Sequence, residues 1–289
     1  MSDMTEPLYV TDLPDRALIS VIGPGWRDFL QGLLSQDVLT LATGELRFAG
    51  LLTPQGKLLF DLFLLGRDDG CLIDVAAERR GALIQRLNLY RLRAKVEIAA
   101  AQGAVLAAWP ATAAPGPGWA PDPRLPALGV RGYDVAAPGI ATRLNAAAYD
   151  LHRLTLGVPD PGRDCPSEST YPIEANFDLL AGIDFKKGCF VGQETTSRMK
   201  RRAAVRTRML PIRFEGPAPA FGAEVLAGDL RAGEVRWGLA GHAMALLRID
   251  RIENAVLTVD ERPMQVERPA YFEVLGSGAA VGLADLADA

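Results

Sequence analysis

The stretch from residue 47 to residue 75 restricts the fold more than any other part of the chain. Three apolar runs follow one another there, and the sequences Thr-Pro-Gln-Gly and Asp-Asp-Gly separate them. Proline, glycine and aspartate in these places are typical of tight turns between neighbouring strands. The pattern therefore predicts an antiparallel meander of three strands.

The segments on either side of this meander alternate between strand and helix patterns. Upstream, a short β run precedes Pro24, which suits the first turn of the helix that follows. Downstream, apolar spacing predicts a helix over residues 76–92 and a strand over 94–100. Residues 110–126 are rich in Pro, Gly and Ala and carry few charges, so we expect an exposed connection there.

The middle of the chain continues the alternation. A strand is expected over residues 128–135, and a helix over 143–156. Thr142 is a suitable N-cap for that helix, and Gly157 is a suitable C-terminal stop. Residues 158–172 hold four prolines, so we expect them to be irregular.

The character of the sequence changes after Arg208. Short β-type runs follow one another, with Gly, Pro or Asp between them, and the last expected strand covers residues 271–275. Such spacing predicts a small antiparallel barrel of about 80 residues, although residues 238–249 also suit one helical turn. The fold class is therefore α+β. We place an α+β region at residues 1–205, with a subdomain joint near 101–126, and the barrel domain at 206–289.

Composition narrows the functional classes. The first residues lack the basic segment and apolar run of a secretion signal, and no stretch approaches the roughly 18 apolar residues of a membrane span. The chain is expected to be soluble, cytoplasmic and without a membrane partner. Three cysteines and two histidines at wide spacing argue against a disulfide framework. They also offer too few ligands for a preformed zinc or iron–sulfur site, so we predict no metal centre.

Charge is unevenly distributed along the chain. Between Lys186 and Arg213 there are nine Lys or Arg and one acid, which gives a local charge of +8. The net charge of the chain is −4, so the rest of the chain carries −12. Such a segment attracts polyanions, either a nucleic acid or a small multicarboxylate. Phe190 is its single aromatic residue, whereas RNA-binding surfaces interleave basic and aromatic residues. We therefore expect no nucleic-acid partner.

Cys189 lies within this basic segment, directly after Lys186, Lys187 and Gly188. A helix is predicted from Gln193 to Arg202. A helix start and neighbouring cations both favour a thiolate, provided that the thiol is partly exposed. The alternative is that Cys189 is a small buried apolar residue, as most free cysteines are. Cys71, in a strand pattern, and Cys165, in an irregular stretch, are expected to be structural.

The sequence Lys-Gly-Cys-Phe-Val-Gly-Gln-Glu at 187–194, followed by Ser-Arg, resembles the signature of the YgfZ family of folate-binding proteins. This family includes mitochondrial iron–sulfur assembly factors and is similar in fold to the T-protein aminomethyltransferase of glycine cleavage. Residues 29–38, 51–64, 90–98 and 171–185 also resemble family segments. The resemblance implies two intertwined α+β subdomains that bind tetrahydrofolate, and a C-terminal barrel. It assigns folate contacts within the signature to Lys187, Gly188, Gln193, Glu194 and Arg198.

The resemblance to the T-protein also shows where this chain departs from it. An acidic residue of that enzyme is replaced by Cys189, an arginine by Gln193, and a folate-contacting carboxylate by Thr155. A pair of aspartates in its hairpin is reduced to Asp61. Because aminomethyl transfer uses carboxylates to position an amine, these changes argue against that activity.

Other candidate folate contacts lie outside the signature, and each has a structural alternative. Glu174 and Asn176 suit an aminopterin edge, although Glu174 also suits a turn cap. Tyr171 suits stacking or core packing. Asp61 suits a pocket or an edge strand that resists aggregation. The remaining candidates are Gln55, otherwise a solvated turn residue, and Lys200, Arg201, Arg202 and Arg206 for a polyglutamate tail, otherwise a solvated helix face.

Three functions follow from these observations. The first is a tetrahydrofolate-binding accessory factor for assembly or repair of iron–sulfur proteins, with Cys189 as its reactive thiol and client proteins or assembly factors as partners. The second is a folate-dependent aminomethyltransferase or demethylase, so the status as an enzyme stays open. The third, an RNA-binding module, is the weakest. The sequence leaves the oligomeric state undetermined and favours a monomer.

Overall fold

The computed structural model describes residues 7–111, 114–201 and 205–272. The chain divides into two compact units, each assembled from three separate stretches. Unit 1 comprises Met1–Leu52, Phe60–Tyr149 and Leu180–Val191, and unit 2 comprises Thr53–Leu59, Asp150–Leu179 and Gly192–Ala289. The tip of the predicted meander and the Cys189 segment therefore lie at points where the chain passes from one unit to the other.

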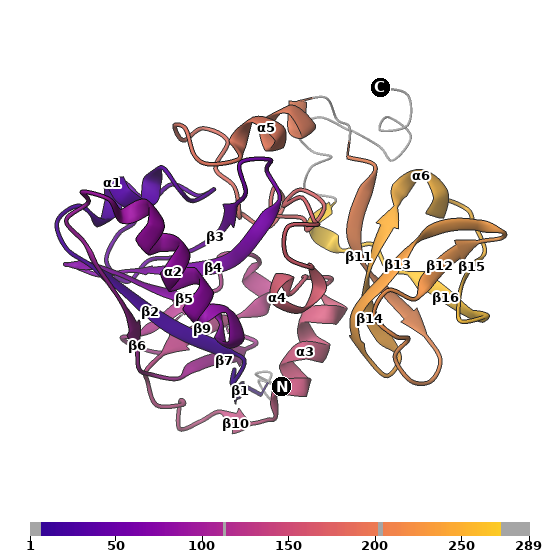
Figure 1. The fold of residues 1–289 in the computed structure, drawn as a ribbon. Coiled ribbons are helices and arrows are strands. Elements are labelled where there is room, and N and C mark those ends of the chain that lie inside the picture. Colours follow the sequence, from indigo (N-terminus) through magenta and orange to yellow (C-terminus); the bar gives the residue numbers. More distant parts are fainter. Residues whose placement is uncertain (1–6, 112–113, 202–204, 273–289) are drawn as a thin grey trace. The chain divides into compact units, whose positions relative to one another are not determined.

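The predicted meander is confirmed as part of a five-stranded sheet in the order β3-β4-β5-β2-β6 (Figure 1). Its antiparallel pairs place Leu64 opposite Ile73, and Ile19 opposite Ile73 on the other side. Every residue of β4 and β5 is buried, so both faces of the sheet are covered. The strands are β2 (Arg16–Ile22), β3 (Leu46–Leu52), β4 (Leu58–Gly66), β5 (Gly70–Ala76) and β6 (Glu97–Ala101).

A second five-stranded sheet in unit 1 has the order β10-β1-β7-β9-β8. Its β1 runs parallel to β10 and antiparallel to β7. Val10, Leu106 and Val130 belong to an apolar cluster on this sheet. The strands are β1 (Tyr9–Asp12), β7 (Val105–Trp109), β8 (Trp119–Pro121), β9 (Val130–Tyr133) and β10 (Thr142–Arg143).

The expectation of an exposed connection over residues 110–126 holds only in part: residues 114–118 are mostly exposed, whereas four residues after them are buried. Trp119 and Ala120 of β8 are buried, and so are Asp122 and Arg124 after it. Arg124 donates to both carboxylate oxygens of Asp122, at 2.9 and 2.8 Å. Trp119 and Ala120 are part of the sheet, because β8 pairs with β9 at its edge. The ion pair between Arg124 and Asp122 offsets the cost of burying these two charged side chains.

Helices connect the strands, and two of them correct the sequence-based boundaries. The helix expected from residue 143 begins at Ala146, because Thr142 belongs to strand β10 and pairs with β1. The side chain of Asn145, in place of the predicted cap Thr142, accepts from the Ala148 N–H. The proline-rich stretch contains a helical turn whose N-cap is Asp160. The helices are α1 (Trp26–Gln31), η1 (Ala77–Arg79), α2 (Arg80–Arg91), η2 (Pro126–Leu128), α3 (Ala146–Thr155), α4 (Pro161–Asp164), α5 (Gln193–Arg201) and α6 (Ile249–Ile252).

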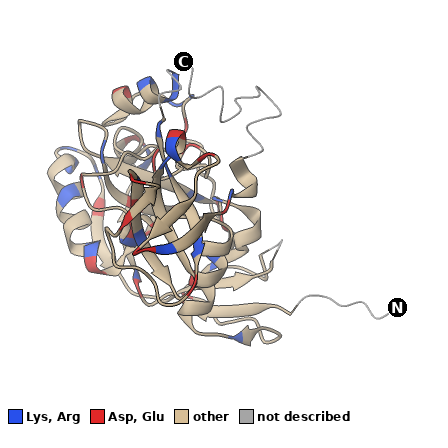
Figure 2. Ribbon diagram, turned by 90° about the vertical axis from the view of Figure 1, so that its right-hand side faces the viewer, with Lys and Arg blue, Asp and Glu red and all other residues tan. Residues whose placement is uncertain are grey.

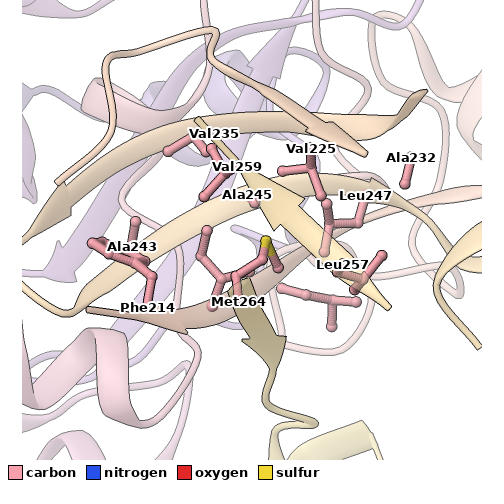
Figure 3. Close-up of a cluster of buried hydrophobic side chains, with 12 residues drawn as sticks. Phe214, Val225, Ala232, Val235, Ala243, Ala245, Leu247, Leu257, Val259 and Met264 are labelled. Carbon is pink, nitrogen blue, oxygen red and sulfur yellow. The ribbon is translucent and has the colours of Figure 1, made fainter. Parts of the chain in front are cut away.

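The predicted C-terminal barrel is confirmed. Its antiparallel strands close in the order β11-β14-β13-β12-β15-β16. Aliphatic side chains such as Val225, Val235 and Leu247 point into its interior (Figure 3). Residues 238–248 belong to the β13–β14 hairpin, and Ile249 begins α6. The expected strand at 271–275 is described only to Phe272, and the described residues belong to a short 3-10 turn. The strands are β11 (Thr207–Phe214), β12 (Glu224–Ala227), β13 (Leu230–Leu239), β14 (His242–Arg248), β15 (Leu257–Val259) and β16 (Arg262–Val266).

Candidate functional site

Cys189 is exposed, whereas Cys71 and Cys165 are buried. Burial raises the pKa of the Cys71 thiol to about 12, so that sulfur stays protonated at neutral pH. The alternative in which Cys189 fills the core is therefore excluded, and the condition of partial exposure is met. Cys189 is the one cysteine of the chain with a thiol accessible to a small molecule or a partner.

The loop that carries Cys189, residues 180–191, is fastened to the rest of unit 1 by Ser35. The Ser35 hydroxyl donates to the carbonyl of Gly182 at 2.6 Å and accepts from the Gly50 N–H at 2.7 Å. The Asp184 N–H donates to the Ser35 carbonyl at 2.9 Å. Ser35 itself is fully buried. The loop is irregular in backbone shape but has fixed hydrogen-bond partners.

The Lys187 side chain also anchors this loop to the rest of unit 1. Its ammonium group donates to the backbone carbonyls of Gln31, Leu34 and Gln36 at 2.8, 2.6 and 2.8 Å. Burial lowers the pKa of Lys187 to about 8, while the carboxylates of Asp37 and Asp184 act in the opposite direction. In this structure the predicted folate contact Lys187 uses its donors on the protein's own backbone.

In unit 2, the tip of the meander packs on the start of α5. Gly56 and Gly192 both have positive φ, +83° and +81°. A Cβ atom on Gly56 would lie 2.9 Å from the Thr195 Cβ and 3.0 Å from the Gly192 carbonyl oxygen. Glycine at position 56 is therefore required twice, by backbone conformation and by space. Gln55 is exposed beside it.

Helix α5 carries most of the other signature residues. Glu194, Arg198, Lys200 and Arg201 are exposed, and Gln193 is the first residue of the helix. Figure 2 shows the basic residues of α5 in blue at the top of the view. Lys200 pairs with Asp178 at 3.4 Å, and the side chain of Arg201 donates to the Ser197 carbonyl at 3.3 Å. Arg202 lies outside the described residues.

A polar group surrounds Glu174 in unit 2. One Glu174 oxygen accepts from the Tyr171 N–H at 2.8 Å, which is the predicted turn cap. Burial raises the pKa of Glu174, and the Tyr171 N–H and the charges of Lys57, Arg236 and Arg208 oppose that effect. The Lys57 ammonium lies 3.3 Å from the centroid of the Tyr171 ring. One face of Tyr171 is therefore covered by a cation, a contact that no sequence pattern indicates.

Asn176 is fully buried and has a φ of +61°. Its amide nitrogen donates to the Met209 carbonyl at 2.7 Å and to the Tyr271 hydroxyl at 3.2 Å. Its amide oxygen is buried with no hydrogen-bond partner. Asn176 thus holds β11 in place, and its buried amide oxygen has no hydrogen-bond partner among the described residues.

Asp61 is buried and accepts from Arg16 Nη1 at 3.0 Å. The edge-strand reading is wrong, because β4 lies between β3 and β5. Arg16 also pairs with Asp74, whose second oxygen accepts from Arg131 at 2.7 Å. Asp61 is therefore part of an ion network inside unit 1.

Within the described residues, no group of three or more His, Cys, Asp or Glu side chains is arranged to hold a metal ion. No helix of the described part of the chain is long and apolar enough to cross a membrane.

Known proteins match this chain over most of its length. The family model described as "CAF17, C-terminal beta-barrel domain" matches residues 206–273. The iron-sulfur cluster assembly factor IBA57 homolog, mitochondrial, of Mycosarcoma maydis is 34% identical over 70% of this chain. The human mitochondrial iron-sulfur cluster assembly factor IBA57 is 32% identical, over 84% of this chain and 78% of its own length. The chain belongs to the IBA57 family.

Fungal members of the IBA57 family are longer than this chain. The match covers 56% of the Mycosarcoma maydis protein and 56% of its Neurospora crassa counterpart, which is 33% identical over 74% of this chain. The chain thus spans little more than half the length of these relatives.

The fold of this IBA57 family member is that of an aminomethyltransferase. The glycine cleavage system aminomethyltransferase T from Bartonella henselae superposes with a TM-score of 0.73, over 93% of this chain and 87% of that protein, at 18% identity. The predicted T-protein-like α+β core with a C-terminal antiparallel barrel is confirmed. At this level of identity the likeness concerns the fold alone.

Three residues that shape the site, Ser35, Lys57 and Arg208, were absent from the sequence-based candidates. Arg208 donates to the Ile173 carbonyl and pairs with Asp178, both at 2.6 Å. Their partners lie far away in the sequence; those of Lys57 are Ser169 and Tyr171. A cation directly after a Pro-Gln-Gly turn was the one local signal available.

Proposed function

We propose that this protein is a tetrahydrofolate-binding accessory factor for the assembly or repair of iron–sulfur proteins, with Cys189 as its reacting thiol. Membership of the IBA57 family supports the pathway, because its relatives are named iron-sulfur cluster assembly factors. The single observation that carries the role of Cys189 is the contrast in exposure: its thiol is open to solvent and the other two are buried. The YgfZ-like signature around it supports the link to folate.

Residues of unit 2 suit the folate. One oxygen of Glu174 accepts from the Tyr171 N–H, and its second oxygen can accept from the amino and ring N–H groups of a pterin. The Asn176 oxygen has no partner among the described residues, but it is fully buried, so a pterin would reach it only by displacing the side chains that cover it. The cations of α5 suit a polyglutamate tail. Bound tetrahydrofolate would supply a carrier of one-carbon units, and the protein residues would hold and orient it.

Calorimetric titration with tetrahydrofolate tests the cofactor. We expect micromolar-range binding that Glu174→Gln weakens about tenfold or more, because the neutral side chain loses a charge-assisted bond. Glu224→Gln, on the exposed surface of the barrel, is the matched control and should bind like the wild type. Replacing Lys200, Arg201 and Arg202 by Ala should weaken the binding of polyglutamylated folate more than the binding of monoglutamate folate. Absence of binding by the wild type would refute the folate proposal.

Complementation tests the thiol and the pathway. Cys189→Ala is expected to fold normally, since the side chain is exposed, and to lose rescue of iron–sulfur enzyme activity in a strain lacking the gene. Cys165→Ala serves as a control thiol, and should retain rescue in proportion to its folded fraction. Full rescue by Cys189→Ala would remove the thiol from the mechanism.

We also propose a cytoplasmic location and a monomeric state, with iron–sulfur clients or assembly factors as partners. The relatives are named mitochondrial, so cell fractionation of the native protein is the direct test of location. Sedimentation at several protein concentrations tests the monomer, and a concentration-dependent dimer would overturn it.

A folate-dependent one-carbon transferase is the second candidate, because the fold is that of an aminomethyltransferase. Two contacts argue against it. Asp61 is engaged by Arg16, and the Thr155 hydroxyl donates to the Leu151 carbonyl of its own helix at 2.9 Å. Neither supplies an uncommitted carboxylate to position an amine. Turnover of a methylamine substrate with tetrahydrofolate would reverse this ranking.

A further inference from the structure

The backbone around Cys189 is held on both sides of the thiol. Before it, Lys187 is fixed through its side chain. After it, the Val191 N–H donates to the Gly32 carbonyl at 3.2 Å. Only Gly188, Cys189 and Phe190 lie between these points. A three-residue span with two fixed ends has few conformations, so its geometry is set by the anchors rather than by the span itself.

The anchor at Lys187 uses the full capacity of its side chain. An ammonium group has three N–H donors, and three carbonyls converge on it. These carbonyls belong to the last residue of α1 and to the turn that follows. The carbonyls at the end of a helix lack partners within the helix, and a cation there is favoured by the helix dipole. Lys187 therefore fastens the Cys189 loop to the end of α1.

Phe190 sets the direction of the span. Its side chain is buried, with 9% of its surface exposed, and its ring centroid lies 5.3 Å from the Lys187 ammonium. Cys189, its neighbour in an irregular stretch, is exposed. Around Gly188 a Cβ atom would meet nothing within 4 Å, so no packing on that side restrains the backbone. The orientation of the thiol thus depends on Phe190 and Lys187.

We propose that Lys187 is a positioning residue that presents the Cys189 thiol, by binding the carbonyls of Gln31, Leu34 and Gln36. The proposal rests on the proposed function in one respect, that Cys189 is the reacting thiol. It assigns different roles to two adjacent lysines. Lys186 is exposed and contributes charge, whereas Lys187 contributes a fixed backbone.

Lysine-to-methionine variants separate these roles, because each removes one charge and keeps most of the side-chain volume. In Lys187→Met we expect hydrogen exchange at the Asp184 and Val191 amides to accelerate at least tenfold. In Lys186→Met the same amides should exchange within twofold of the wild-type rate. Amides in β5 should be unchanged in both variants, which identifies the effect as local. Wild-type exchange at Asp184 and Val191 in Lys187→Met, or equal acceleration in Lys186→Met, would overturn the proposal.

The functional measurement is rescue of iron–sulfur enzyme activity. We expect Lys187→Met to lower rescue at least tenfold, Lys186→Met to lower it less than threefold, and Lys187→Arg to restore part of the loss by binding some of the same carbonyls. Equal loss in both methionine variants would indicate charge rather than position. If Cys189→Ala still rescues, the proposed function fails, while the exchange measurements continue to decide whether Lys187 holds the loop.

Discussion

Between the two sheets of unit 1 lies a network of three aspartates and three arginines, whereas the barrel of unit 2 is filled by aliphatic side chains (Figure 3). Asp74 of β5 joins the two sheets, because it accepts from Arg16 of β2 and Arg131 of β9. Phe63 lies 4.0 Å from the Arg131 guanidinium and 4.9 Å from that of Arg124. The other members are Asp61 and Asp122.

The two interiors differ in how they tolerate change. In the network the opposite charges cancel, and loss of one partner leaves a buried charge without compensation. In the barrel, loss of a methyl group leaves a cavity whose cost depends on how far the neighbours relax. The ionic interior should therefore be more sensitive to single substitutions and to pH, and the aliphatic interior to side-chain volume alone.

Asp74→Ala is expected to have the largest effect. Asp74 is 1% exposed and accepts from Arg16, Arg131 and the Tyr133 hydroxyl. Its removal leaves two buried guanidinium groups unbalanced and should lower the free energy of unfolding by about 3–5 kcal/mol. Urea unfolding at neutral pH measures this. A loss below about 1 kcal/mol would show that water enters the network and that unit 1 does not depend on it.

Leu247→Ala probes the barrel in the same way. Leu247 is fully buried in the aliphatic cluster. We expect a loss of about 3 kcal/mol from lost burial and the cavity left behind. The loss should be the same at pH 5 and pH 7, because no charge is involved. A loss that changes with pH would mean that the barrel is coupled to titrating groups and would weaken the comparison.

The pH dependence of the free energy of unfolding should have opposite directions in the two regions. The arginines hold the pKa of Asp74 and Asp122 below the usual range despite burial, so their contribution is present above about pH 4 and is lost as pH falls further. In unit 2, burial raises the pKa of Asp164 to about 6. The contribution of Asp164 to the free energy of unfolding is present below about pH 4. As the pH rises through 6 that contribution is lost, and the free energy of unfolding falls by roughly 2 kcal/mol. Unfolding measured from pH 4 to pH 7 should show this decline, and Asp164→Asn should flatten it.

The surface pair Arg248–Asp250 gives the smallest expected effect. Its atoms lie 2.7 Å apart, but the two side chains are 36% and 41% exposed. Asp250→Ala should change the free energy of unfolding by about 0.5 kcal/mol or less, because water screens the pair. The same urea measurement applies, and salt should reduce the difference further. A change comparable to that of Asp74→Ala would show that burial is not what distinguishes the two kinds of ion pair.

Local patterns in the sequence determined much of this protein. Turn residues at 53–56 and 68–70 predicted the β3–β4–β5 meander, and short runs with breaks predicted the barrel, because strand period and turn chemistry are properties of neighbouring residues. The residues around Cys189 predicted the start of α5 but left open whether the thiol is exposed or buried. These features need no knowledge of what packs against them.

Only the tertiary structure decided which residues of the chain contact one another. Asp61 belongs to an ion network because Arg16, 45 residues away, reaches it. Trp119 and Ala120 are buried because β8 pairs with β9 in a sheet. Thr142 is a strand residue rather than a cap because β1 pairs with it. Lys187, one of two adjacent lysines, holds a loop because the carbonyls that follow α1 lie within its reach. Each depends on atoms distant in sequence, and their positions follow from packing that no local pattern encodes.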